Sequence, residues 1–471
     1  MRPLLASTSL AVALVVWTTP VAAQSVSEAE AEQMRAEIRA LRARLEAIES
    51  RLQADPAPAV SPSDDRDIGK AAGAIAKAGP ATPPTKPDGV DITWKGSPRF
   101  AQGDKQFKVK GRIQADANHV SSPDGIEDPG LGFSNEMRRI RLGGEGSVGS
   151  GFSYKLELEL SDNSVDLVDT FVSYNAGSWQ VRLGNHNAFQ SLDELTGDTT
   201  GSVMERAAFT DAFNFERRLG ISAGYASGPW LAQFGVFTDD VGALANDSDG
   251  PSGGDENNSY SFDGRLVYAP RIGRTQLHFG GSAHWRRLGR LVDAGTRYRQ
   301  RPFVHSTNTR LIGTPSLNVE TEMHYGLELA AISGRWHGAA EVHALRAERV
   351  GLPSVTFRGG YAEVGYFLTP GDSRGYKEGI FTSAAPARPI GKGGAGSIQV
   401  NLRYDYLDLD SRDIRGGKQN GYIVGLVWSP IQYLRFNLNY ALLSYDGAIA
   451  LPSGSTGYDV RVVGTRFELD F

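Results

Sequence analysis

The chain has 471 residues, no cysteine and a formal net charge of −5 at neutral pH. The absence of cysteine excludes disulfides, zinc–thiolate sites and cysteine nucleophiles. The small negative charge excludes a chain that is basic overall, so any function that needs positive charge must be local.

The first 23 residues are expected to be a secretory signal peptide. Arg2 supplies a positive charge, the stretch from Leu4 to Trp17 is apolar, and the small residues Val21 to Ala23 form a cleavage site. A transmembrane anchor is the alternative, but the apolar stretch is shorter than the ~20 residues that a spanning helix needs. The N-terminus therefore predicts export.

Residues 24–54 are expected to form a periplasmic coiled-coil helix, and residues 55–95 an extended linker. Spacings of four and three alternate between the apolar residues, as in the a/d seam of a coiled coil. These residues are Met34, Ile38, Leu41, Leu45, Ile48 and Leu52. The seam covers only about three heptads, so a single amphipathic helix is the alternative. The linker is rich in Pro, Ala, Gly and Lys and has little to bury.

Residues 96–471 are predicted to be all-β: a 16-stranded antiparallel transmembrane β-barrel. From Phe107 onward, apolar and polar residues alternate, as from Phe152 to Leu160. A large soluble all-β protein would alternate as well. The connections favour a barrel, because short and long ones are expected in strict order, with Thr369–Gly396 as the one long exception. The aromatic end at Phe471 resembles the assembly signal of outer-membrane proteins.

Side chains that face away from lipid line the pore and select what passes. On the predicted registers these include Lys108, Lys110, Arg112, Arg139 and Arg141, with Arg138 at a strand start, and Arg182, Arg265, Arg286 and Arg403.

The most specific cluster is an arginine at every second residue: Arg297, Arg299 and Arg301. In an extended segment, three such guanidiniums lie on one face ~6.6–7 Å apart. A guanidinium stays protonated and binds oxyanions with two hydrogen bonds, so the row predicts a path for anions. A solvated basic outer loop is the alternative.

Several stretches of residues 96–471 resemble the phosphate-selective porins, the O/P-type porins of Gram-negative bacteria. They are Gly111–Asp116, Arg138–Leu160, Asp169–Tyr174, Met204–Arg206, Asp211–Phe213, Tyr366–Gly371 and Asn401–Tyr404. Each stretch is weak alone, but their order along the chain is specific. Some relatives also carry a coiled coil before the barrel.

The resemblance implies a homotrimer in the outer membrane with a pore through each subunit. It implies that Asn187–Arg217 is the constriction loop and that Thr369–Gly396 is an inward-folded periplasmic segment. Arg297, Arg299 and Arg301 then form an arginine ladder, with Arg138 and Arg139 opposite.

The chain departs from the family in the constriction loop, where a lysine is central to phosphate selectivity. The matching stretch reads Leu192-Asp193-Glu194-Leu195-Thr196, with Glu194 at the place of the lysine. A carboxylate that faces the lumen would repel phosphate. Alternatively, Glu194 pairs with a neighbour such as Arg206 and is neutralised.

The leading function is passive diffusion of small anions, phosphate included, without a cofactor, a metal or enzyme activity. One alternative is a general or weakly cation-selective porin, and another is an envelope tether whose coiled coil binds peptidoglycan or a periplasmic partner. A lipid-cleaving barrel is the enzymatic alternative, but no nucleophile set is evident. The expected surroundings are outer-membrane lipid and lipopolysaccharide, with no nucleic acid.

Overall fold

The computed structural model describes residues 89–161, 164–238, 240–241, 258–289, 295–383 and 385–471. The expected signal peptide and coiled coil, and most of the expected linker, lie outside the described residues. In the part that is described, no helix is both long enough and apolar enough to cross a membrane.

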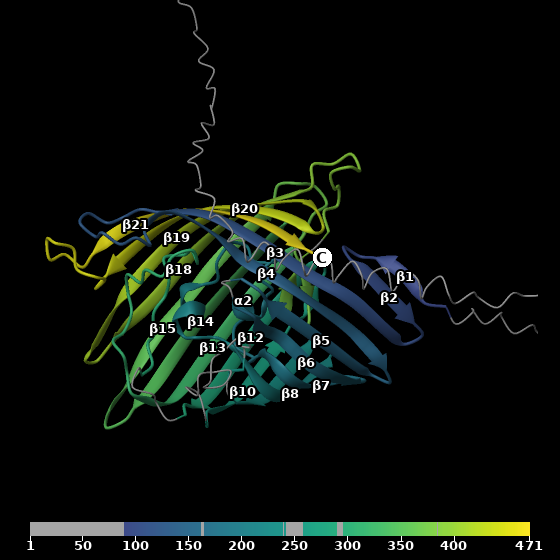
Figure 1. The fold of residues 1–471 in the computed structure, drawn as a ribbon, viewed down its shortest axis with the longest axis horizontal. Helices are drawn as coiled ribbons and strands as arrows, with labels where there is room; N and C mark the ends of the chain where they lie inside the picture. The colour runs from purple at the N-terminus through teal and green to yellow at the C-terminus, as the bar shows by residue number, and fades with distance from the viewer. Residues whose placement is uncertain (1–88, 162–163, 239, 242–257, 290–294, 384) are drawn as a thin grey trace, which may run out of the picture. The chain divides into compact units, whose positions relative to one another are not determined.

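Sixteen antiparallel strands of the described chain close into a barrel (Figure 1). Its strands are β3 (Lys105–Val120), β4 (Gly132–Gly149), β5 (Phe152–Glu159), β6 (Asp166–Ala176), β7 (Trp179–Asn187), β8 (Arg217–Ser227), β9 (Trp230–Phe237), β10 (Tyr260–Tyr268), β12 (Thr275–Arg287), β13 (Val319–Ser333), β14 (Trp336–Arg349), β15 (Leu352–Phe367), β18 (Ser397–Ser411), β19 (Ile414–Ile431), β20 (Leu434–Asp446) and β21 (Tyr458–Asp470). The two-residue strand β11 (Arg271–Ile272) adds to β12. The barrel closes where β21 pairs with β3. The predicted 16-stranded barrel is thus confirmed.

Two short strands extend the sheet along the part of β3 that β21 does not reach. Strand β21 pairs with β3 only from Arg112 to Val120, because strands in a barrel are staggered. The first residues of β3, Lys105 to Lys108, pair instead with β2 (Pro98–Gln102). Strand β2 in turn pairs with β1 (Asp91–Trp94). Strand β1 falls within residues 55–95, so the predicted linker was too long at its end. The edge that the stagger exposes on β3 is the physical reason for these added strands.

The two faces of the wall differ as the alternation predicted. Large apolar side chains such as Leu183, Leu327 and Leu402 are exposed on the outside. Aromatic pairs on neighbouring strands form a girdle at the end of the barrel where the C-terminus lies, here called the terminal end. Five of them, with ring centroids 4.5–5.2 Å apart, are Phe152–Tyr174, Trp179–Tyr225, Trp230–Tyr268, Trp336–Tyr366 and Trp428–Phe436. Such a girdle marks the boundary between lipid and water.

The expected strict order of short and long connections is wrong at the opposite end, here called the loop end. Strands β14 and β15 are joined by residues 350–351, and β18 and β19 by residues 412–413. These long strands are joined by short turns, and the lumen-facing side of each strand buries apolar residues near the loop end. Val355, Phe357 and Leu407 are each 0% exposed and pack against loops that fold inside the barrel.

Three connections fold into the lumen and position its charged groups. The constriction loop, residues 188–216, contains α2 (Leu192–Leu195) and α3 (Ala208–Ala212). The arginine loop, residues 295–318, crosses the loop end of the barrel. The inner segment, residues 368–396, enters from the terminal end and contains β16 (Gly375–Lys377) and β17 (Ile380–Thr382).

Candidate functional site

The two helices of the constriction loop are held at their N-termini by carboxylates of the wall. Glu341 on β14 accepts hydrogen bonds from the backbone nitrogens of Leu192 (3.0 Å) and Asp193 (2.7 Å). Asp405 on β18 accepts one from the backbone nitrogen of Ala208 (3.1 Å). The first backbone N–H groups of a helix lack partners within the helix and favour negative charge, so each contact stabilises the docked loop. Both N-termini are therefore already occupied by carboxylates.

Aromatic packing fixes α3 against the wall. Phe209 is fully buried, and its ring stacks on His343 with centroids 4.3 Å apart. Phe215 packs against His324 and His343 with centroids 5.6 and 5.8 Å apart. The loop is thus packed like a protein core on this side, which sets the height of its charged residues in the lumen.

Asp198 lies among three arginines of the opposite wall. It accepts a hydrogen bond from Arg112, and its Oδ2 is 2.8 Å from Nε of Arg139 and 3.9 Å from Nη1 of Arg141. Burial by itself would raise the pKa of Asp198, but these arginines hold it well below its usual range. The predicted arginines of β3 and β4 are thus brought together, with a loop carboxylate at their centre.

Arg138 also faces the lumen, but not as the start of a strand. Gln114 pairs with Arg139 and Ala115 with Met137, so Arg138 is an extra residue within β4. Such a β-bulge turns two consecutive side chains to one side of the sheet. Arg138 Nε lies 3.8 Å from Oε1 of Glu205 in the constriction loop. The expected position at a strand start was therefore wrong, and the bulge rather than the alternation turns Arg138 inward.

Glu205 is bound more tightly by a residue that the sequence analysis missed. Arg466 on β21 donates hydrogen bonds to Glu205 (2.5 Å) and Asp116 (2.7 Å). Burial opposes ionisation of Glu205, but Arg466 and Arg138 lower its pKa to about 2. Arg466 lies on the inward register of the last strand, so the alternation that found the other wall arginines also predicts its direction.

Glu194 and Asp193 are both paired with arginines. Oε2 of Glu194 lies 3.3 Å from Nε of Arg206, and Asp193 accepts a hydrogen bond of 3.0 Å from Arg403 of the wall. Arg206 also donates to the backbone oxygens of Asp193, Glu194 and Thr196 at the end of α2. Burial raises the pKa of Glu194 even though Arg206 acts in the opposite direction. Of the two alternatives for Glu194, a free carboxylate facing the lumen or a salt bridge to Arg206, this geometry corresponds to the salt bridge.

The arginine loop places its row of arginines away from the wall. Tyr298 and Gln300 are buried and bond to Glu322 on β13 and Gln419 on β19. The alternate residues Arg297 and Arg299 are exposed, and neither has an ion-pair partner among the described residues. Arg301 is partly exposed, and its Nη1 lies 3.7 Å from Oδ1 of Asp211. The three predicted residues therefore share one face, in an irregular loop rather than a strand.

A fourth arginine of this loop, Arg310, was not singled out in the sequence. Bridges from Thr296 to Leu317 and from Arg299 to Gly313 fold the loop back on itself. This returns Arg310 to the neighbourhood of Arg299 and Arg301. Burial and the charge of Arg301 lower the pKa of Arg310 to about 10. Arg310 is separated from the arginine row in sequence, and only the folding back of the loop brings it close to Arg299 and Arg301.

The inner segment supports the constriction loop from below. Arg374 donates to Ser202 Oγ at 2.6 Å and to the backbone oxygen of Thr200. Arg265 on β10 donates to Glu328 on β13 (2.6 Å) and to the backbone oxygen of Gly379 (2.9 Å). The segment thus folds inward as the resemblance implied. Lys108 and Lys110 lie nearer the terminal end, where Lys110 is 3.6 Å from Glu145.

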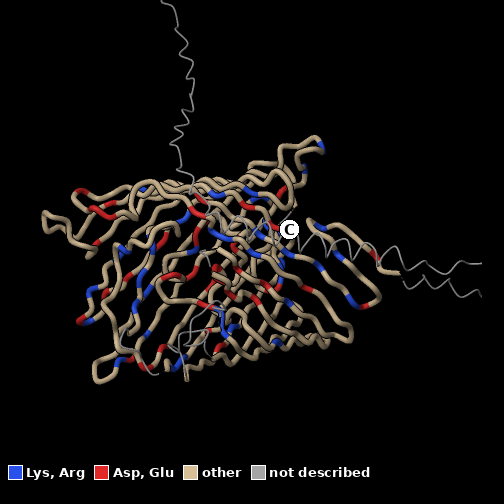
Figure 2. Tube along the Cα trace, in the orientation of Figure 1, with Lys and Arg blue, Asp and Glu red and all other residues tan. Residues whose placement is uncertain are grey.

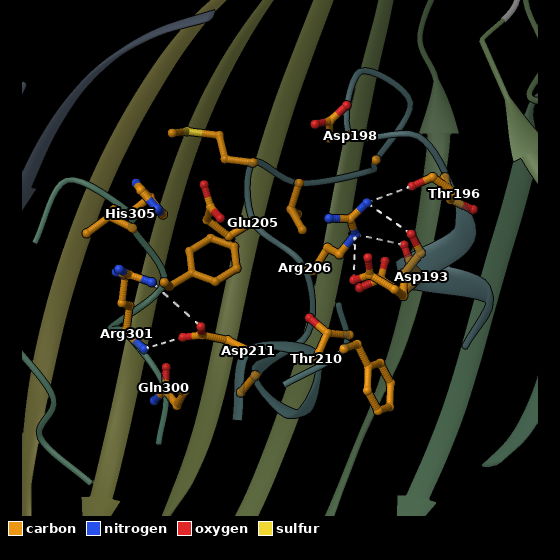
Figure 3. A pocket seen from close by; sticks show the side chains of 18 of the residues that line it. Asp193, Thr196, Asp198, Glu205, Arg206, Thr210, Asp211, Gln300, Arg301 and His305 are labelled. Carbon is orange, nitrogen blue, oxygen red and sulfur yellow. Dashed lines mark hydrogen bonds and ion pairs between the residues drawn. The ribbon is translucent and has the colours of Figure 1, made fainter. Parts of the chain in front are cut away.

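Residues of both the constriction loop and the arginine loop line a cavity of about 550 Å³. Figure 3 shows Arg301 and His305 on one side and Arg206 and Asp193 on the other. Nine carboxylates and seven arginines from the described residues line this cavity, and both signs of charge are interleaved within the barrel (Figure 2). The cavity is therefore not basic overall, and its attraction for anions depends on which arginines lack a carboxylate partner.

Comparison with known proteins assigns most of the chain to one family. Residues 107–471, more than half of the chain, match the family described as phosphate-selective porin O and P. The chain belongs to this family. An uncharacterized protein of Caulobacter vibrioides is 62% identical over 399 residues, which covers 84% of this chain and 80% of the relative.

Solved structures of other porins were also found to be similar. An anion-selective porin from Comamonas acidovorans is 14% identical, with a TM-score of 0.46, and covers 78% of this chain and 100% of its own. OmpT of Vibrio cholerae is 8% identical, with a TM-score of 0.49, and covers 79% and 99%. The outer-membrane channel DcaP of Acinetobacter baumannii is 12% identical, with a TM-score of 0.45, and covers 78% and 98%.

Membership of the phosphate-selective porin family and the closed barrel together identify an outer-membrane porin. A porin is a channel through which solutes diffuse, and a lumen lined by charged side chains selects among them.

Proposed function

We propose that this porin conducts small anions, phosphate included, and works as a homotrimer in the outer membrane. The single observation that carries the proposal is the arginine loop, whose residues 295–318 contain four arginines and no carboxylate. Arg297 and Arg299 are exposed and lack ion-pair partners among the described residues. Free guanidiniums bind oxyanions directly, whereas paired ones contribute little net charge.

The arginines of the wall support the proposal less than their number suggests. Arg112, Arg139 and Arg141 share Asp198, and Arg138 and Arg466 share Glu205. Their positive charge is thus largely neutralised by the constriction loop. On this proposal, the arginine loop attracts anions at the entrance, and the paired wall arginines hold the constriction loop in place.

A weakly cation-selective porin is the second candidate. The nine carboxylates and seven arginines around the cavity favour it, because the balance of charge in a constriction acts on every ion that passes.

Replacing Arg297, Arg299 and Arg301 together by Ala tests the proposal. The reversal potential of the full-length protein in a bilayer with a potassium chloride gradient should shift toward cations. Repeating the measurement with potassium phosphate tests phosphate itself. A wild-type reversal potential on the cation side would favour the second candidate. An unchanged potential in a folded triple variant would mean that the row is only a solvated basic loop.

A further inference from the structure

Two loops of opposite charge meet across the cavity. The constriction loop has six carboxylates and one arginine in residues 188–216, and the arginine loop has four arginines and no carboxylate in residues 295–318. They touch where Oδ2 of Asp211 accepts a hydrogen bond of 2.7 Å from the backbone nitrogen of Arg301. A solute in the cavity therefore meets negative charge on one side of this contact and positive charge on the other.

Asp211 and Glu216 are the most exposed carboxylates of the constriction loop. Four of the six, Asp193, Glu194, Asp198 and Glu205, are buried or largely buried in ion pairs with arginines. The side chain of Asp211 is 40% exposed, and its Oδ1 lies 3.7 Å from Nη1 of Arg301. This loose pair leaves carboxylate charge open to the cavity, where it can attract a cationic group.

Arg310 supplies the complementary group on the arginine loop. Its Nε and Nη1 are buried and have no hydrogen-bond partner among the described residues. Buried N–H groups without an acceptor are costly, and such groups commonly indicate a place for a water or an ion. Arg299 and Arg301 lie on the neighbouring segment of the same loop. An anionic group bound next to Arg310 would therefore reduce the repulsion among the three guanidiniums.

We propose that the contact between the two loops recognises small solutes that carry a carboxylate and an ammonium group on the same carbon, as α-amino acids do. The carboxylate is bound by Arg301 and the ammonium group by Asp211, which both line the cavity, while Arg310 does not line it and adds positive charge beside Arg301. This inference rests on the proposed function, because the solute is first drawn in by its anionic group at the arginine loop.

The charge pattern explains why such a solute is preferred over a simple anion of equal size. A carboxylate at Arg301 lies close to Asp211, which repels it. An ammonium group on the same solute turns this repulsion into attraction and replaces part of the interaction between Asp211 and Arg301. The expected gain is about fivefold in affinity, the size of the largest contributions from partly exposed ion pairs.

Alanine and lactate provide a matched pair of probes, because they differ only in an ammonium group and a hydroxyl. Both are added to the full-length porin in a planar bilayer, and the concentration that halves the chloride current is measured. Alanine should act at about fivefold lower concentration than lactate. Asp211→Asn should remove this preference and leave lactate equally or more effective, since an amide still accepts the hydrogen bond from Arg301. Arg310→Gln should weaken both probes.

Asp413→Asn is the matched control, because Asp413 pairs with Arg349 at 2.7 Å on an outer turn and does not line the cavity. It should leave both probes unchanged. The inference is overturned if lactate acts at the same or a lower concentration than alanine in the wild type, or if Asp211→Asn keeps the preference. Either result leaves the anion function standing, because that function is tested separately by the reversal potentials of the wild type and of the triple arginine variant.

Discussion

Replacing Asp198 by Asn removes the carboxylate at the centre of the wall arginines with almost no change in size. Asp198 lies 2.8 Å from Nε of Arg139 and 3.9 Å from Nη1 of Arg141, and it also bonds to Arg112. Without its charge, Arg139, which lines the cavity, keeps no ion-pair partner among the described residues, whereas Arg112 keeps Asp470 and Arg141 keeps Glu159. We therefore expect Asp198→Asn to create a strong oxyanion site and to shift selectivity toward anions.

The expected size follows from the distances. Two unit charges about 4 Å apart interact by about 4 kcal/mol at the effective dielectric constant of a protein surface. If a permeating phosphate recovers a quarter of one such interaction, about 1 kcal/mol, its affinity rises about fivefold. Removing one partner of a buried ion pair costs about 3–5 kcal/mol. We expect the lower part of that range for the loop, because the amide oxygen can still accept a hydrogen bond from Arg112 or Arg139.

The assay is phosphate block of the chloride current through the full-length protein in a planar bilayer. Asp198→Asn should lower the phosphate concentration for half block by about fivefold. Glu348→Gln is the control for charge, since Glu348 pairs with Arg346 at 3.5 Å on the outer face of the wall and both side chains are about half exposed. This control should leave the phosphate block unchanged.

An unchanged phosphate block in a folded Asp198→Asn variant would refute the reasoning, because it would mean that the arginines are not reached from the cavity. Acid provides a second check. The pKa of Asp198 is depressed in the folded protein, so its contribution is present above the unfolded value near ~3.9 and is lost only as pH falls through the lower folded value. Wild type at a pH just below ~3.9 should therefore not behave like Asp198→Asn.

Two further predictions concern Glu194 and the coiled coil that is expected near the N-terminus. The pKa of Glu194 is raised, so as the pH falls from neutral its carboxylate should become protonated at a pH above the ordinary glutamate pKa of about 4.3. The positive charge of Arg206 is then no longer neutralised, and the preference for anions should increase. Glu194→Gln should show the increased preference at neutral pH and lose this part of the pH dependence of the reversal potential; an unaltered pH dependence would contradict the assignment. A peptide of residues 27–53 should sediment as a trimer, since the heptad seam is compatible with three strands. A persistent dimer at high concentration would count against a three-stranded bundle.

Alternation along the strands was sufficient to predict the barrel wall. Leu434, Phe436 and Leu438 face out and Arg435, Asn437 and Asn439 face in, because successive side chains of a strand point to opposite faces. The same rule gave the inward direction of Arg112, Arg139 and Arg141. It failed at Arg138, where a bulge adds one residue, and a bulge leaves no signal in a period of two.

The sequence alone thus determined the fold and the direction of most wall residues, because both depend on local periodicity. Tertiary structure alone decided which charges are free. Asp198 neutralises arginines 57 to 86 residues away in the chain, and Arg466 reaches Glu205 across 261 residues. Arg310 joins the arginine row only because its loop folds back. Ion pairs depend on distances of a few ångströms between segments far apart in sequence, and no local pattern encodes those distances.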